Sequence, residues 1–181
     1  MNLRDQRGFV SLLALFMIIC FFSVGALVTD VAKHFCVKVA VKYKLNLACR
    51  NASAQIDEEE IKNANLVIDE ARAAQAFYDV LKVNLDLNDS LAPNAGSILS
   101  SGPVRVDYFK VVSPSEVPFI YSFGGMTETV TRPAVVAIIS FPVESGVFAR
   151  LAGQPDETTM YCHVTSAPEL ISRPVERSLG L

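Results

Sequence analysis

Histidine is scarce in this chain, and the common catalytic motifs are missing from it. Only two of the 181 residues are histidines, His34 and His163. The sequence contains no Walker loop, no G-x-S-x-G and no G-x-G-x-x-G. Its four cysteines form no C-x-x-C and no spacing typical of a metal site. We therefore predict a protein that is not an enzyme, with no catalytic residue, no cofactor and no metal.

Neither histidine lies in a pattern that points to catalysis or metal binding. His34 is two residues from Cys36 in a predicted helix, a spacing that turns the two side chains away from each other. We interpret His34 as a residue of a solvated helix face. His163 follows Cys162 in a predicted strand, so the two side chains should lie on opposite faces of the sheet.

The chain also has no excess of positive charge. The formal net charge is −3, which argues against binding of nucleic acid by the whole chain. The acidic run Asp57–Glu60 lacks the alternating carboxylates and the internal glycine of a calcium loop, so it indicates the start of a helix. Basic residues instead gather in one stretch: Lys33, Lys38, Lys42, Lys44 and Arg50.

The cysteines do not form a disulfide framework. Cys20 lies within an apolar run, and Cys36 and Cys49 lie in one predicted helix where they cannot meet. A Cys49–Cys162 bridge is geometrically allowed if the compartment is oxidising.

The most informative stretch is Phe9–Val28, twenty residues without a charged side chain. As a helix it spans about 30 Å, which is the thickness of the hydrocarbon core of a bilayer. Thirteen of its residues are Leu, Ile, Val or Phe, and each favours insertion by roughly 0.3–0.6 kcal/mol. We predict a leader at 1–8 and a transmembrane helix at 9–29, so that the lipid bilayer is the first partner.

Two alternatives stay open for this stretch. A secretory signal peptide would begin with Arg4 and Arg7 and end near the small residues Ser23–Ala26, but the apolar run continues through Val28. The orientation is also open, because the lysines after the run outnumber the two arginines before it. By the positive-inside rule that count favours a cytoplasmic C-terminus.

The helix is predicted to continue well beyond the membrane. From Phe9 to Ser53 there is no proline, and 30–54 is amphipathic. We predict one helix of roughly forty-five residues. Its apolar stripe packs either on the chain's own domain, which we favour, or on neighbouring copies or partner helices; it consists of Val31, Phe35, Val39, Tyr43 and Leu47.

These N-terminal residues resemble a known family. Arg7-Gly8-Phe9 is similar to the leader of type IV prepilins, which is cut after a glycine so that Phe9 would become the new N-terminus. The stretch from Arg7 to Ala54, with Asp30-Val31 directly after the apolar helix, resembles the Tad (tight adherence) pilus-assembly pseudopilin-like proteins, the TadE/TadG-like family.

This resemblance implies a single-pass protein of the bacterial cell membrane whose C-terminal domain is extracytoplasmic, in contrast to the lysine count. It implies other pilus or secretion subunits, and further copies of this chain, as partners. Prepilins usually carry a glutamate at the fifth position after the cleavage site, and here that position is Leu13. A glutamate buried in lipid needs a charged partner, and in pilins that partner is the N-terminus of a neighbouring subunit. The absence of this glutamate therefore favours an anchored accessory protein over a filament subunit.

The remainder of the chain predicts an α+β domain at 55–170 and a flexible tail at 171–181. Asp69 should cap a helix over 70–85, and a short strand is predicted at 66–68. Beyond Pro103 the pattern alternates with a period of two. Strands of an antiparallel sheet are expected at 104–111, 119–123, 127–131, 135–141 and 158–166, with 135–141 at the centre because it is the most apolar.

Two functions are compatible with these features. The first is a non-enzymatic, membrane-anchored scaffold of a Tad-type pilus or secretion machine. The second is a secreted or membrane-tethered module that binds a ligand through the loops of its sheet. For the second, a soluble fragment that begins at about Asn51 is expected to fold alone.

Overall fold

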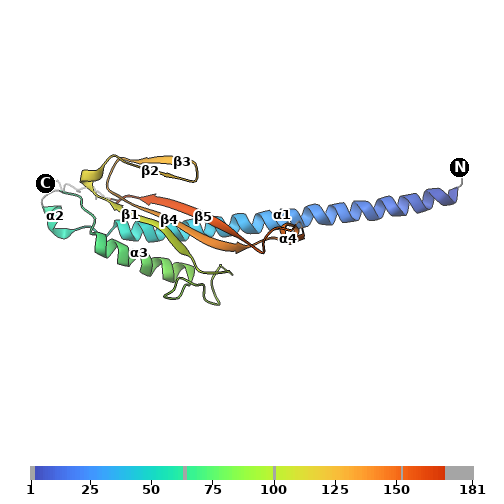
Figure 1. Cartoon of the computed structure of the whole chain (residues 1–181), viewed down its shortest axis with the longest axis horizontal. Helices are drawn as coiled ribbons and strands as arrows, with labels where there is room; N and C mark the ends of the chain where they lie inside the picture. The colour runs from blue at the N-terminus through green and yellow to red at the C-terminus, as the bar shows by residue number, and fades with distance from the viewer. Residues whose placement is uncertain (1–2, 63–64, 100, 152, 170–181) are drawn as a thin grey trace, which may run out of the picture.

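A single long helix and a smaller α+β body make up the molecule (Figure 1). The computed structural model describes residues 3–62, 65–99, 101–151 and 153–169. The predicted tail at 171–181 lies outside the described residues. The α+β class is confirmed, with one long N-terminal helix, a three-stranded antiparallel sheet and a separate two-stranded sheet.

Helix α1 runs without interruption over Leu3–Ser53, so the predicted continuation beyond the apolar run is confirmed. It begins before Phe9, and the described part of the predicted leader belongs to the same helix. By length and composition, α1 is the one described helix that qualifies as a membrane span, with a mean hydropathy of 2.6 over its most apolar window. None of that window is buried against the rest of the chain.

Two further helices follow α1. Helix α2 (Glu58–Lys62) begins in the acidic run as predicted. Helix α3 (Glu70–Leu85) has its predicted bounds, because the Asp69 carboxylate accepts a hydrogen bond from the Arg72 N–H at 3.0 Å. The strand predicted at 66–68 is not formed; Ile68 makes only an isolated bridge to Ile56.

The larger sheet has the order β1 (Arg105–Val112), β4 (Ala134–Glu144), β5 (Glu157–Ser166), all antiparallel. The apolar strand β4 is central, as predicted. Strands β2 (Phe119–Phe123) and β3 (Met126–Val130) form a hairpin of their own across Gly124-Gly125, so the single predicted sheet divides into two. The short helices η1 (Pro114–Glu116) and α4 (Val147–Leu151) were not predicted.

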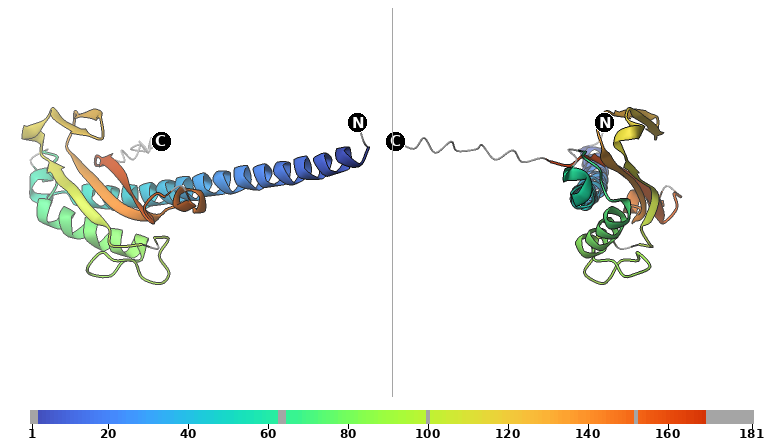
Figure 2. Two further views of the ribbon diagram at one scale, coloured as in Figure 1. Left: turned by 45° about the vertical axis from the view of Figure 1, so that its right-hand side comes forward. Right: turned by 90° about the vertical axis from the view of Figure 1, so that its left-hand side faces the viewer.

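Strand β4 is buried on both faces because different layers cover them. Val135, Ala137 and Ile139 belong to the core shared with α1 and α3. Val136 and Ala134 belong to a smaller core beneath the β2–β3 hairpin. The structure therefore has three layers, helices, sheet and hairpin, which Figure 2 shows in its end-on view.

Strand β1 departs from the predicted alternation at Asp107. Its register against β4 shifts between Val106 and Tyr108, which leaves Asp107 as the extra residue of a bulge. As a consequence Val106 and Phe109 pack on the same helical side, and the Phe109 ring lies 4.7 Å from that of Phe77 on α3.

The second half of α1 is part of the domain core. Its fully buried residues are Val41, Leu45, Ala48, Cys49 and Ala52. The core therefore crosses the predicted boundary between residues 54 and 55. A fragment that begins at Asn51 would lack four of these five side chains, so the expectation that it folds alone is not supported by the packing.

Candidate interaction surface

The predicted stripe lies mostly on the surface of α1. Val31, Phe35, Val39 and Tyr43 are exposed, Phe35 by 67%, and only Leu47 is partly buried. Our favoured interpretation, that this stripe packs on the chain's own domain, is wrong for the four exposed residues. The stripe recurs at steps of four residues and the buried set at steps of three and four. Both spacings keep side chains on one helix face, so periodicity alone did not decide which set the domain covers.

The stripe follows directly from the apolar run. Val24, Leu27 and Val28 are exposed at the end of the run, and Val31 and Phe35 continue the exposure at the same helical spacing. Because each residue advances the helix by 1.5 Å, Tyr43 lies about 20 Å beyond Val28. An apolar surface thus extends from the candidate membrane span along α1 as far as Val39 and Tyr43, which face Glu128 of β3 across a cleft.

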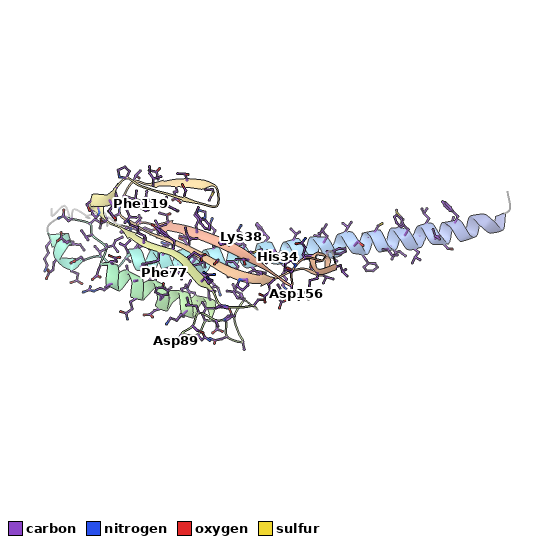
Figure 3. All side chains as sticks on the ribbon, viewed as in Figure 1. His34, Lys38, Phe77, Asp89, Phe119 and Asp156 are labelled. Carbon is purple, nitrogen blue, oxygen red and sulfur yellow. The ribbon has the colours of Figure 1, made fainter. Side chains whose placement is uncertain are left out.

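Polar residues on the opposite side of α1 hold the end of the sheet. The His34 Nε2 lies 2.9 Å from the Glu144 carbonyl oxygen, and since a carbonyl only accepts, the imidazole N–H donates. The Lys33 Nζ lies 3.5 Å from the Glu144 carboxylate. His34 is therefore not the solvated residue that we predicted; it joins α1 to the last residue of β4. Figure 3 shows His34 at the same end of the sheet as Asp156.

Asp30 makes the contact nearest to the apolar run. Its Oδ2 accepts a hydrogen bond from the Phe148 N–H of α4 at 3.1 Å. Gly146 packs so closely on the Asp30 side chain that a Cβ at this position would overlap it. The family resemblance marks Asp30 but not its partner, because nothing in the sequence links it to a residue 118 positions later.

A cleft opens between α1 and the β2–β3 hairpin, with a volume of about 480 Å³. Val39 and Tyr43 of the stripe form part of its wall, so the stripe leads into it. Its lining includes a cation, an imidazole and a carboxylate, from Lys42, His163 and Glu128. Leu47 instead lines a second cleft near Arg50 and Glu169, whose side chains form an ion pair at 2.9 Å.

Tyr121 connects the hairpin to the larger sheet at the edge of the first cleft. Its hydroxyl donates to the Glu128 carboxylate at 2.5 Å and lies 2.9 Å from the Thr165 hydroxyl of β5. Burial, with a further contribution from the hydrogen bond to Glu128, raises the pKa of Tyr121 to about 12. The phenol is therefore a neutral donor at physiological pH, and it fixes the orientation of Glu128.

The two cysteines considered for a bridge are both free and buried. The Cys162 thiol lies 3.8 Å from the Lys38 carbonyl oxygen, and burial raises its pKa. Burial raises the pKa of the Cys49 thiol to about 12. Both thiols therefore stay protonated near neutral pH, which makes them poor nucleophiles.

Gly8 and Phe9, the predicted processing site, lie within α1. Phe9 is exposed, and apart from its chain neighbours and the adjacent helix backbone, no atom lies within 4 Å of the position of a Cβ at Gly8. The geometry leaves room around this peptide bond, and cleavage there stays a prediction.

No group of three His, Cys, Asp or Glu side chains in the described part of the chain is arranged to hold a metal ion. Comparisons of the chain with protein-family models, with curated proteins and with solved structures find no match.

Proposed function

We propose that this protein is a membrane-anchored, pseudopilin-like structural component of a bacterial Tad-type pilus assembly or secretion machine, and that it acts as a non-enzymatic scaffold. In this proposal α1 crosses the cell membrane once through Phe9–Val28, and the α+β domain stands outside the cytoplasm. The proposal draws on the resemblance of the N-terminal stretch and on the physical character of α1.

The observation that carries the proposal is the exposed stripe at Val31, Phe35, Val39 and Tyr43. A chain that needed only an anchor would gain nothing from apolar side chains in water beyond the bilayer. Large exposed apolar strips on soluble surfaces are typical of interaction sites. A helix of another membrane-anchored subunit would run beside α1 and pack an apolar stripe of its own against this one, as paired helices do.

Substitution of the stripe tests this role. Phe35→Asp together with Val39→Asp places two charges on the proposed interface, and neither residue belongs to a buried core. We expect the full chain carrying both changes to lose co-purification with the pilus or secretion subunits of its own cell. Val83→Asp, at an 80% exposed position on α3, is the matched control and should retain it. Equal recovery with both variants would contradict the scaffold role.

The intact mass of the mature protein tests the pilin-type leader. Cleavage after Gly8 predicts a chain that begins at an N-methylated Phe9. A chain that begins near Ala26 would show that the run is a removed signal peptide and would overturn the anchor. An uncleaved Met1 would leave a membrane anchor without pilin-type processing.

The cleft beside Tyr43 favours a second function, a membrane-tethered module that binds a ligand. Lys42 and His163 line this cleft, whereas Phe35 lies outside its lining. If binding through this cleft is the function, Lys42→Glu in the full chain should abolish co-purification of whatever binds there. Phe35→Asp alone should not. The scaffold proposal requires the reverse order.

A further inference from the structure

The connection between β4 and β5 carries the apolar side chains of the short helix α4. Val147 is 54% exposed and Leu151 78% exposed, while Phe148 is partly buried. Arg150 between them is exposed as well. Two exposed apolar residues on one turn of helix, next to a cation, form a small amphipathic surface on the domain.

The position of α4 is set by its contacts with α1. The Asp30 carboxylate holds the Phe148 N–H, and Gly146 packs against the same side chain. About one turn further along α1, His34 and Lys33 hold Glu144 at the end of β4. Figures 1 and 2 both show α4 beside α1, at the end of the domain that faces the N-terminal half of the helix.

This position coincides with the edge of the apolar run. Asp30 is two residues beyond Val28, which corresponds to about 3 Å along the helix axis. The headgroup region on each side of a bilayer is about 5–8 Å thick. If Phe9–Val28 spans the hydrocarbon core, α4 is therefore held at the depth of the headgroups. Ser23 and Ala26 of α1 are partly buried, at the spacing that continues the Asp30 face toward the membrane.

We propose that α4 is a second membrane contact, which rests in the interface with Val147 and Leu151 toward the acyl chains and Arg150 toward the lipid phosphates. This inference rests on the membrane anchoring proposed above. The bilayer is the occupant because the exposed side chains of α4 adjoin the apolar run that enters it. Interfacial segments gain affinity from buried apolar area and from cations near anionic headgroups.

The contact has a mechanical consequence. A single helix through a bilayer leaves the attached domain free to tilt and to turn about the helix axis. A second contact on one side of α1 restricts both motions. The stripe from Val31 to Tyr43 would then point in a constant direction, as a partner subunit in the same membrane requires.

The absence of tryptophan from the chain makes the test direct. Leu151→Trp supplies a single fluorophore on α4 in the full chain, reconstituted into phosphatidylcholine vesicles that contain anionic phosphatidylglycerol and lipids brominated on their acyl chains. Ile120→Trp, at an exposed apolar position on β2, is the matched control. Phe16→Trp, in the middle of the apolar run, reports the anchor itself.

We expect shallow brominated lipids to quench the Leu151→Trp emission at least about twofold more than the Ile120→Trp emission, as for a side chain 5–10 Å into the interface. Equal quenching of these two variants, with strong quenching of Phe16→Trp, would overturn the α4 contact and leave the anchor in place. Weak quenching of all three would overturn the anchor as well. All three positions are exposed, so unchanged circular dichroism is expected of each variant.

Discussion

The two halves of α1 have the same secondary structure and different surroundings. Residues 9–28 are apolar on every side and touch almost nothing else in the chain. Residues 30–53 bury one face, around Leu45 and Ala48, in the domain core. The first half exposes apolar side chains on every side, which is compatible with a bilayer around it, whereas the second half finds its apolar surroundings within the protein. Two halves of one continuous helix therefore differ in what covers them, and the change falls near Asp30.

The largest effect is expected from charged residues placed in the first half of α1. Phe16→Arg together with Ile19→Arg should disfavour insertion by roughly 6 kcal/mol, because each arginine costs about 2.5–3.5 kcal/mol near the bilayer centre and the lost apolar residues contributed a little. We expect the variant to stay at the bottom of a membrane flotation gradient. Phe16→Leu with Ile19→Leu is the control and should float. Flotation of the arginine variant like the unchanged chain would mean that the first half does not span the membrane.

A second prediction compares two faces within the second half. Leu45→Ala removes a fully buried side chain and should lower the free energy of unfolding by about 2–5 kcal/mol. Val39→Ala, on the exposed stripe, should lower it by less than about 0.5 kcal/mol. Urea unfolding in detergent micelles, followed by near-ultraviolet circular dichroism, measures both. A large loss from Val39→Ala would show that the stripe is packed after all.

A third prediction concerns the buried thiol of the second half. Burial raises the pKa of Cys49 from its ordinary value of 9.0, which we take for the unfolded chain, to about 12 in the folded chain. Folding therefore favours the neutral thiol. The contribution of Cys49 to the free energy of unfolding is fully present below pH 9 and is lost as the pH rises toward 12. At pH 10 the free energy of unfolding should be lower than at pH 8 by roughly 1 kcal/mol from this group.

The control for this pH dependence is Cys49→Ala. The variant keeps the contributions of Tyr121 and Cys162, so only the share of Cys49 disappears from its pH profile. Urea unfolding at both pH values measures the difference. Identical profiles for the variant and the unchanged chain would show that Cys49 is open to solvent.

The smallest expected effect lies at the junction of the two halves. Asp30→Ala removes the acceptor of the Phe148 N–H and should weaken the docking of α4 by about 1 kcal/mol. Hydrogen exchange of the Phe148 amide should accelerate roughly fivefold. Asp57→Ala, which removes the acceptor of the Glu59 N–H at α2, is the control and should leave Phe148 unchanged. Unaltered exchange in the Asp30 variant would mean that the docking of α4 does not depend on the Asp30 carboxylate.

Local chemistry accounts for what could be predicted of the fold. The Asp69 cap and the apolar spacing after it define α3, and the uninterrupted apolar stretch in β4 identifies the central strand. Both signals lie within a few residues of the element that they describe. By contrast, helix α4 is too short for a periodic pattern, and the bulge at Asp107 reverses the alternation on which the prediction of β1 relied.

The candidate interaction surface was predicted only in part. The residues of the stripe were identified, but their exposure was not, because two sets of apolar residues on α1 both have a spacing that fits one helix face. Asp30 was visible as the first charge after the apolar run, while its partner Phe148 lies far along the chain. His34 was misjudged for the same reason, since the Glu144 carbonyl oxygen that it contacts comes from a distant strand.

The sequence by itself determined a long uninterrupted helix, an apolar first half fit for a bilayer, and an α+β domain after it. These follow from proline-free spacing, from transfer free energies and from alternation, all of which act over short stretches of chain. Only the tertiary structure decided which face of α1 the sheet covers, that the stripe stays exposed, and that α4 rests against Asp30. Those outcomes depend on contacts between residues more than a hundred positions apart, where local pattern carries no information about which surfaces meet.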